Sequence, residues 1–334
     1  MNGFSQSAGI APASAASLSG AVPRSVTRDG SVTVTEVIDL YFGAYEGRDT
    51  TRVQRLGWWR DRLGHVTLAD LDDDMIFDAM ESLATRHGAY YAGKDVEGAA
   101  ILRAKRKPLS PATQNRYLSA VSAILTWAQR RRITPKGWIH PCRAIELKPE
   151  KNARVRFLTD AERGALLTAA RASKWDRLYL FVLAGLTTGA RRGELENLRW
   201  RDVDLERGEA AVDQSKNGDR KTLPLVANVI EELRKFEGAP DSLIFSSKRR
   251  PGQPFNLTPA WKTALEEADI KNFKVHDLRH DCASTLAKAG ASLLEIGDLL
   301  GHRQQQVTKR YAHLCVDHKK ALVRRVLGTV GDAT

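Results

Sequence analysis

The segment KPEKNARV, at residues 148–155, is charged and poor in apolar residues, and it interrupts a chain that carries periodic apolar positions on both sides. A chain of 334 residues is long for a single hydrophobic core, so two domains are expected. Because few contacts cross an exposed polar segment, we predict that the chain passes between domains here. The predicted parts are an amino-terminal domain, a linker and a carboxy-terminal domain, at residues 31–147, 148–157 and 158–328.

The two ends of the chain differ from these domains in composition. Residues 1–30 are mostly Ala, Ser, Gly and Pro, without Lys or Arg before Arg24, which is typical of disorder. We predict a disordered tail there and a second short tail at residues 329–334. No apolar run reaches the length of a membrane span, and the three cysteines share no metal-ligand spacing. These features favour a cytoplasmic protein with reduced thiols.

The amino-terminal domain has the apolar periodicity of helices almost throughout. Its best-defined helix begins at Ser110, has Pro111 in its first turn and continues to Arg132. The face of this helix opposite the apolar stripe carries Gln114, Asn115 and Arg116. Residues 88–108 contain several glycines and a basic run that ends at Pro108, and we predict a loop or an insertion there.

The carboxy-terminal domain opens with a capping box from Thr159 to Glu162, and a strongly apolar helix follows at residues 175–186. Asn217-Gly218 is a strong hairpin signal, which places Lys216 on the tip or shoulder of a hairpin. Short strands are predicted at residues 203–205, 210–212, 222–225 and 243–245. The predicted fold class is therefore mainly α with a small antiparallel β-sheet.

The charge of the chain points to a polyanionic partner. Lys and Arg exceed Asp and Glu by 52 to 40, which gives a formal charge of +12 and a pI near 9.7. The basic residues also cluster, in one run at Arg103, Lys105, Arg106 and Lys107 and in a second run at residues 130–132. Charge alone does not distinguish a nucleic acid from other partners.

Six residues supply the chemistry of phosphodiester transfer through a tyrosine: Arg191, Lys216, His276, Arg279, His302 and Tyr311. Two arginines hold the oxygens of one phosphate as planar forks, which lysine cannot do. A tyrosine hydroxyl can attack phosphorus, but its pKa of about 10 means that a neighbour must take its proton, and histidine suits that task. A lysine can protonate the departing alkoxide.

Each of these residues, taken alone, also has an ordinary structural explanation. Glu194 either pairs with Arg191 across one helical turn or is a plain surface carboxylate. His280 is expected to pack or to make a supporting hydrogen bond rather than to meet the reacting atoms. His313 competes with His302 for the catalytic role, but it stands two residues from Tyr311 and on another helical face.

The order of the motifs resembles one family. The strings TTGARRGELENLRW, SKNGDRKTLPL, HDLRH, LLGH and RYAH follow one another as in the tyrosine recombinases, and more specifically the phage-type integrases. The likeness covers roughly residues 32–327. It implies a helical, SAM-like core-binding domain that binds DNA, followed by an α+β catalytic domain.

The resemblance also implies a role for each matched residue. Arg191 and Arg279 would grip the scissile phosphate, His302 would donate to it, and Tyr311 would attack. Lys216 would protonate the 5′-hydroxyl, and His276 would act as a general base or hydrogen-bond partner. The implied reaction passes through a 3′-phosphotyrosine and requires no ATP, no metal and no other cofactor.

The implied partners are double-stranded DNA and further copies of the chain, as a homotetramer on synapsed DNA and a monomer when free. We expect DNA contacts from Asn115 and Arg116, unless their helix is simply an amphipathic surface helix, and from Lys105, Arg106 and Lys107. The segment after Tyr311 docks either on a neighbouring protomer or on its own domain. Two other functions remain open, a relaxing topoisomerase of the tyrosine type and a regulator that has kept the fold and lost catalysis.

Overall fold

The structure is a computed structural model that describes residues 30–47, 49–95, 97–150, 156–213, 220–302 and 305–328. The chain divides into two compact units, Met1–Asn152 and Ala153–Thr334, and this division falls within the segment predicted as a linker. The predicted tails lie outside the described residues, except for Gly30. Within the described ranges, no helix is both long and apolar enough to span a membrane.

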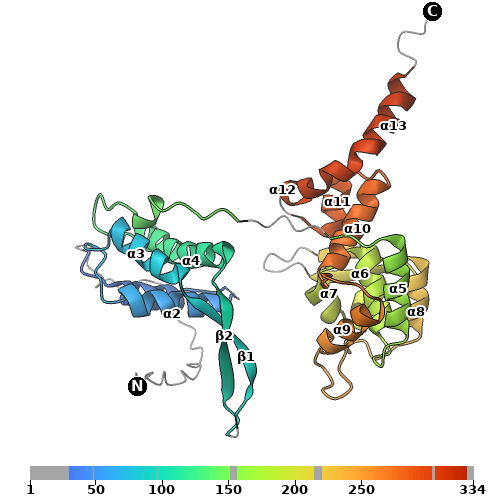
Figure 1. Cartoon of the computed structure of the whole chain (residues 1–334), viewed down its shortest axis with the longest axis horizontal. Coiled ribbons are helices and arrows are strands. Elements are labelled where there is room, and N and C mark those ends of the chain that lie inside the picture. The colour runs from blue at the N-terminus through green and yellow to red at the C-terminus, as the bar shows by residue number, and fades with distance from the viewer. Residues whose placement is uncertain are drawn as a thin grey trace, which may run out of the picture. The chain divides into compact units, whose positions relative to one another are not determined.

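The first unit is built around one central helix. Its helices are α1 (Val34–Gly43), α2 (Thr51–Leu63), α3 (Asp73–Ala84), α4 (Pro111–Arg130) and a short 3₁₀ turn, η1 (Pro141–Arg143). Helix α4 packs against the other three α-helices and buries one apolar side among them (Figure 1). Its start is fixed by Ser110, whose side chain accepts a hydrogen bond from the Thr113 backbone, and by Pro111 in the first turn.

The prediction of a loop at residues 88–108 is wrong, because the segment forms a β-hairpin. Strands β1 (His87–Lys94) and β2 (Ala100–Pro108) pair antiparallel with two irregularities in register. The ribbon extends beyond the helices of its own unit, and every residue of β2 is exposed (Figure 1). No face of the hairpin meets a core, so its sequence lacks the alternation of apolar and polar residues from which strands are predicted.

The second unit contains a helical layer and a small sheet. Its helices are α5 (Asp160–Arg171), α6 (Leu178–Thr188), α7 (Arg192–Glu196), α8 (Ala227–Arg234), α9 (Thr258–Glu267), α10 (Asp277–Lys288), α11 (Leu293–Leu300), α12 (Gln305–Thr308) and α13 (Val316–Leu327), with 3₁₀ turns η2 (Trp200–Asp202) and η3 (Lys309–Cys315). Strands β3 (Val203–Asp204), β4 (Glu209–Asp213) and β5 (Arg220–Pro224) form an antiparallel sheet in that order.

The predicted fold class is confirmed, and three of the four strands predicted in this unit are present. The fourth, at residues 243–245, is wrong: Leu243 makes only an isolated bridge to Arg199. These residues read as a strand because they are apolar, and they are indeed buried. Burial without a continuous ladder partner produces the same sequence pattern as a short strand.

Helix α6 is the centre of the second unit. It is apolar on nearly all sides, as expected of a helix surrounded by protein. It packs against α5, α7, α8 and α10. Helix α6 ends at Gly189, which has a left-handed backbone with φ of 60°, a conformation that glycine adopts without a steric penalty.

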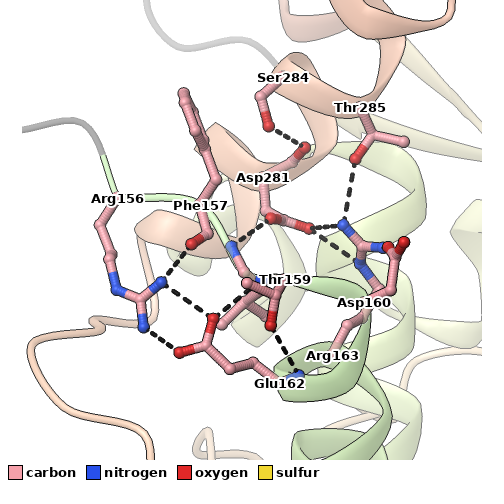
Figure 2. Close-up of polar contacts among 10 residues, drawn as sticks. Arg156, Phe157, Thr159, Asp160, Glu162, Arg163, Asp281, Ser284 and Thr285 are labelled. Atoms are coloured by element: carbon pink, nitrogen blue, oxygen red, sulfur yellow. Dashed lines mark hydrogen bonds and ion pairs between the residues drawn. The ribbon is translucent and has the colours of Figure 1, made fainter.

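A polar cluster fixes α10 against the start of the unit (Figure 2). The buried Asp281 carboxylate of α10 accepts hydrogen bonds from the Leu158 backbone at 2.8 Å and from the Arg163 guanidinium at 3.1 and 3.2 Å. Next to it, Glu162 closes the predicted capping box with Thr159 and pairs with Arg156. A buried carboxylate with three donors holds α10 at one rotation about its axis.

We expect the stability of this unit to fall in strong acid partly through Glu162. The hydrogen bonds from Arg156 and from the Thr159 backbone lower the pKa of Glu162 from 4.5 to about 2. Its contribution is therefore fully present above pH 4.5 and is lost as the pH falls through about 2. Glu162→Gln should lower the free energy of unfolding at pH 7 by about 1 kcal/mol, since the pair is partly exposed to solvent.

Chemical denaturation of both proteins across the pH range measures this difference. The gap between Glu162→Gln and the parent should close in the acid range given above. A gap that stays constant from neutral pH down to pH about 2 would contradict the ionic explanation.

Candidate active site

Arg279 lies at the centre of the predicted site and is almost fully buried. One guanidinium nitrogen donates to the Gly189 carbonyl at 2.8 Å, and another donates to the Leu300 carbonyl at 2.6 Å. These carbonyls stand at the carboxyl ends of α6 and α11, where the helix dipoles favour a cation. Burial, and then the charge of Arg191, lowers the pKa of Arg279 to about 10, so the group remains a cation at neutral pH.

Arg191 stands at the start of α7 and shares its carboxylate partner with a second cation. Its side chain pairs with Glu194 at 2.6 Å and donates to the Gly301 carbonyl at 3.2 Å. The predicted pairing of Arg191 with Glu194 is therefore confirmed. Burial acts to raise the pKa of Glu194, but the hydrogen bond from the Arg191 backbone and the charge of Lys221 outweigh it, and the pKa is lowered.

The second cation is Lys221, which the sequence analysis did not single out. Its ammonium is buried, donates to the Leu300 carbonyl at 3.3 Å and lies 3.6 Å from Glu194. Burial lowers the pKa of Lys221 to about 8, although Glu194 acts against this change. The sequence held a signal for this residue: Lys221 lies two positions from the buried Leu223 on the same face of β5, where a lysine is out of place.

Two histidines of the predicted set lie in the field of these cations. Burial lowers the pKa of His302 to about 4, and the charges of Arg279 and Arg191 act in the same direction. The pKa of His276 is also lowered, by burial and then by Arg279. The His302 ring makes a 2.8 Å hydrogen bond with the Thr308 hydroxyl, which fixes its orientation beside the αL glycine Gly301. Both imidazoles are therefore neutral at pH 7.

Tyr311 is buried, and Arg279 is close enough for its charge to affect the pKa of the phenol. The side chain is 1% exposed and packs in a small cluster with Ala283, Ile296 and Leu300. Burial raises the pKa of the phenol, while Arg310 and Arg279 act to lower it. The hydroxyl lies 2.6 Å from Nδ1 of His280. His280 thus meets the predicted nucleophile directly, in contrast to the packing or supporting role expected from the sequence.

The remaining predicted site residues lie outside the described residues, in the first unit or on η3. Lys216 lies outside the described residues, as does the predicted Asn217-Gly218 turn. Arg116 is exposed on α4, and Lys105, Arg106 and Lys107 are exposed on β2, all in the first unit. His313 is exposed on η3 and makes none of the contacts described for the cluster.

The prediction that Asn115 lies on the exposed face of its helix is wrong. The side chain is buried, its amide donates to the Lys148 carbonyl at 2.8 Å and to Glu150 at 2.9 Å, and its oxygen accepts from the Lys148 backbone at 2.9 Å. With its polar atoms engaged in this way, Asn115 ties α4 to the end of the first unit. It has no free edge to present to a base pair.

Taken together, the cluster has the charge that suits an anion. Arg191, Arg279 and Lys221 converge within one region, and Glu194 is the carboxylate that pairs with two of them. Burial is the largest cause of the lowered histidine pKa values, and the charges of Arg279 and Arg191 add to it. A phosphate between these cations would replace their mutual repulsion with attraction.

Comparison with known proteins agrees with this chemistry. The profile of the Phage integrase family matches residues 156–318. The integrase of Salmonella phage P22 is 27% identical over 292 residues, which cover 81% of this chain and 73% of that protein. The tyrosine recombinase XerA of Thermococcus kodakarensis is 30% identical over 200 residues, which cover 55% of this chain and 70% of that protein.

Solved structures share the fold. The Tn1549 transposon integrase, in complex with a circular intermediate DNA, has a TM-score of 0.68 at 17% identity and covers 89% of this chain and 100% of its own. A lambda integrase fragment, solved as a dimer bound to a COC′ core site, has a TM-score of 0.60 at 21% identity and covers 84% of this chain and 95% of its own.

These relatives define the class of protein, an enzyme that breaks and rejoins DNA strands. The chain belongs to the tyrosine recombinases, and its residues 156–318 are similar to the Phage integrase family. It is a site-specific DNA recombinase, and the comparisons favour neither of the two alternatives, a topoisomerase or an inactive regulator.

We expect Gly189→Ala to disturb the backbone carbonyls that hold Arg279. An added methyl group would lie 2.4 Å from a Leu300 side-chain carbon at a backbone φ of +60°. The strained backbone alone costs about 1 kcal/mol, and relief of the clash displaces the two carbonyls that hold Arg279. Thermal unfolding should show the loss of stability, and DNA cleavage should fall further than the stability loss explains.

Gly193→Ala is the matched control for this change. Its added methyl group meets no atom within 4 Å, and the residue lies in helix α7. Alanine there should be neutral or slightly stabilising. Equal losses of stability and of DNA cleavage in both variants would contradict a specific role for Gly189.

Proposed function

We propose that this recombinase integrates and excises a prophage or a similar mobile element, with Tyr311 as the nucleophile that forms a 3′-phosphotyrosine. The observation that carries the proposal is the convergence of Arg191, Arg279 and Lys221 beside neutral histidines and a buried tyrosine hydroxyl. An anion site next to a hydroxyl nucleophile suits phosphoryl transfer. The likeness to the integrase of phage P22 supports integration as the biological setting.

In the proposed reaction the arginines act on the phosphate. Arg279 has carbonyl partners for two of its nitrogens, which orient the fork and leave its other donors for the phosphate. Arg191 supplies the second fork. His302 and His276, as neutral imidazoles, donate hydrogen bonds to phosphate oxygens, so the charge that develops in the transition state is stabilised by preorganised donors.

Proton transfer completes the proposal. A neighbouring imidazole takes the proton of the Tyr311 hydroxyl, the Tyr311 oxygen forms a bond to phosphorus, the bond from phosphorus to the 5′-oxygen breaks, and Lys216 gives its proton to that oxygen. Strand joining reverses these steps with a 5′-hydroxyl from the partner strand. Because the number of phosphodiester bonds is unchanged, the reaction requires no external energy source.

The burial of Tyr311 adds a requirement to this reaction. A phenol that is 1% exposed cannot reach phosphorus without a movement of η3 or its neighbours. We propose that binding to DNA supplies the free energy for this movement. The chain would then be a monomer when free and a homotetramer on synapsed DNA, within the cytoplasm.

The proposed DNA surface in the first unit includes Arg116 and the β1–β2 hairpin. Four basic side chains, Arg103, Lys105, Arg106 and Lys107, stand exposed on β2, and none has a carboxylate within ion-pair distance among the described residues. A two-stranded ribbon has the width of the major groove, and its lysines and arginines can contact phosphates on either side.

Tyr311→Phe tests the nucleophile. A nicked suicide substrate carrying the target site should trap a covalent adduct with the parent and none with this variant, because the variant lacks only the reacting oxygen. DNA binding, measured by gel shift, should change by less than about threefold, corresponding to one lost hydrogen bond at most. An adduct that persists in Tyr311→Phe would assign the nucleophile to another residue.

The double variant Lys105→Gln/Lys107→Gln tests the hairpin. It should weaken DNA binding. It should also reduce the slope of log affinity against log salt by about 2, because fewer counterions are released from the DNA when two phosphate contacts are lost. The matched control is Lys262→Gln/Lys271→Gln, because these exposed lysines already pair with Glu266 and Asp269. Equal salt slopes for both double variants would remove the hairpin from the DNA surface.

A further inference from the structure

The hydroxyl of Tyr311 has one polar partner among the side chains that the structure describes, and that partner is His280. Their separation, 2.6 Å from Oη to Nδ1, is that of a strong O–H···N hydrogen bond. His276 stands nearby, with its ring edge-on to the His280 ring and 4.9 Å between the ring centroids, but it makes no hydrogen bond to the hydroxyl.

We propose that His280 is the catalytic residue that takes the hydroxyl proton of Tyr311 as strand cleavage begins, and that it returns this proton in strand joining. The inference rests on the proposed function, in which Tyr311 is the nucleophile. It separates two tasks: His280 acts on the nucleophile, whereas His276 acts on the phosphate.

The step balances as follows. The O–H bond of Tyr311 breaks and an N–H bond forms at Nδ1 of His280, while the phenolic oxygen bonds to phosphorus and the bond from phosphorus to the 5′-oxygen breaks. The 5′-oxygen receives a different proton, from Lys216. In strand joining the phenolate leaves phosphorus and recovers the proton from His280, so neither group is consumed.

The charge state of His280 suits a proton acceptor. Burial, and then the charges of His276, Arg310 and Arg279, lowers the pKa of His280 to about 4, and Asp277 acts against this change. The imidazole is therefore neutral at pH 7, and with its proton on Nε2 it accepts at Nδ1 the hydrogen bond that the phenol donates. A protonated His280 could not accept.

Bound phosphate improves this base. Burial is the largest cause of this low pKa, but the charges of Arg310 and Arg279 act in the same direction, and Arg279 would hold the scissile phosphate. A phosphate anion offsets their charge and raises the pKa of His280 from its low value. Proton transfer from the phenol is thus less unfavourable when substrate is present than in its absence.

The fold holds both partners of this hydrogen bond. Helix α10 is fixed by Asp281, the residue directly after His280, through its contacts with Leu158 and Arg163 (Figure 2). The Tyr311 ring is enclosed by the apolar cluster that includes Ala283 and Ala287 of the same helix. These contacts hold the hydrogen bond in the free protein, and the proposal requires that it persist when η3 moves to bring Tyr311 to the phosphate.

His280→Asn separates proton transfer from positioning. The asparagine oxygen stands close to the place of Nδ1 and can accept the phenol hydrogen bond, but it cannot take the proton. In single-turnover adduct formation on the suicide substrate, with the full-length chain, we expect cleavage to be slower by about 100-fold or more. DNA binding and thermal unfolding should match the parent.

A fluorinated tyrosine at position 311 supplies the decisive comparison. Fluorine lowers the pKa of the phenol, so the nucleophile depends less on a base. Fluorotyrosine at position 311 should raise the cleavage rate of His280→Asn by at least tenfold. It should not raise the cleavage rate of His276→Asn. If His280→Asn folds poorly, His280→Gln is compared in the same way.

The results distinguish the two proposals. Cleavage at the parental rate in His280→Asn, or a loss that fluorotyrosine leaves unchanged, overturns the role of His280. Rescue of His276→Asn in place of His280→Asn assigns the proton to His276. An adduct that forms without Tyr311 instead overturns the proposed function itself.

Discussion

The capture of Arg279 by the ends of two helices is the constraint on which the second unit depends. Helices α6 and α11 each end in a left-handed glycine, and the carbonyls at these ends hold one guanidinium. A cation buried in this way requires both carbonyls, since a charge without partners costs several kcal/mol in a protein interior. These groups therefore depend on one another: the two helix ends, the arginine, and the buried lysine that shares the Leu300 carbonyl.

Helix α10 connects this charged centre to the start of the unit. Asp281 faces the opposite side of the same helix from the phosphate site and receives donors from Leu158 and Arg163. Two oppositely charged, buried residues two positions apart, Arg279 and Asp281, leave the helix a single rotation in which both are satisfied. The orientation of every other side chain on α10, His280 included, follows from that rotation.

The sequence predicted local features well and distant pairings poorly. The capping box at Thr159 and the pairing of Arg191 with Glu194 span three residues, so spacing alone indicates them. Asn115 is buried by a partner 33 residues away, and His280 meets a hydroxyl 31 residues away. No periodicity reports such contacts. The order of motifs indicated a set of site residues, of which Arg191, His276, Arg279 and His302 affect one another's charges in the structure, but Lys221 was missed because Lys216 already filled the lysine role.

The β1–β2 hairpin has a further consequence for the protein in solution. Two paired strands with no neighbouring sheet leave an unpaired backbone edge on each side, and such edges can pair with the edges of other copies. The exposed Tyr91 and Leu102, which are opposite each other in the ribbon, would favour that association. The lysines and arginines along β2 oppose it, since two like-charged ribbons repel. The basic run thus protects the free chain against aggregation before any partner is bound.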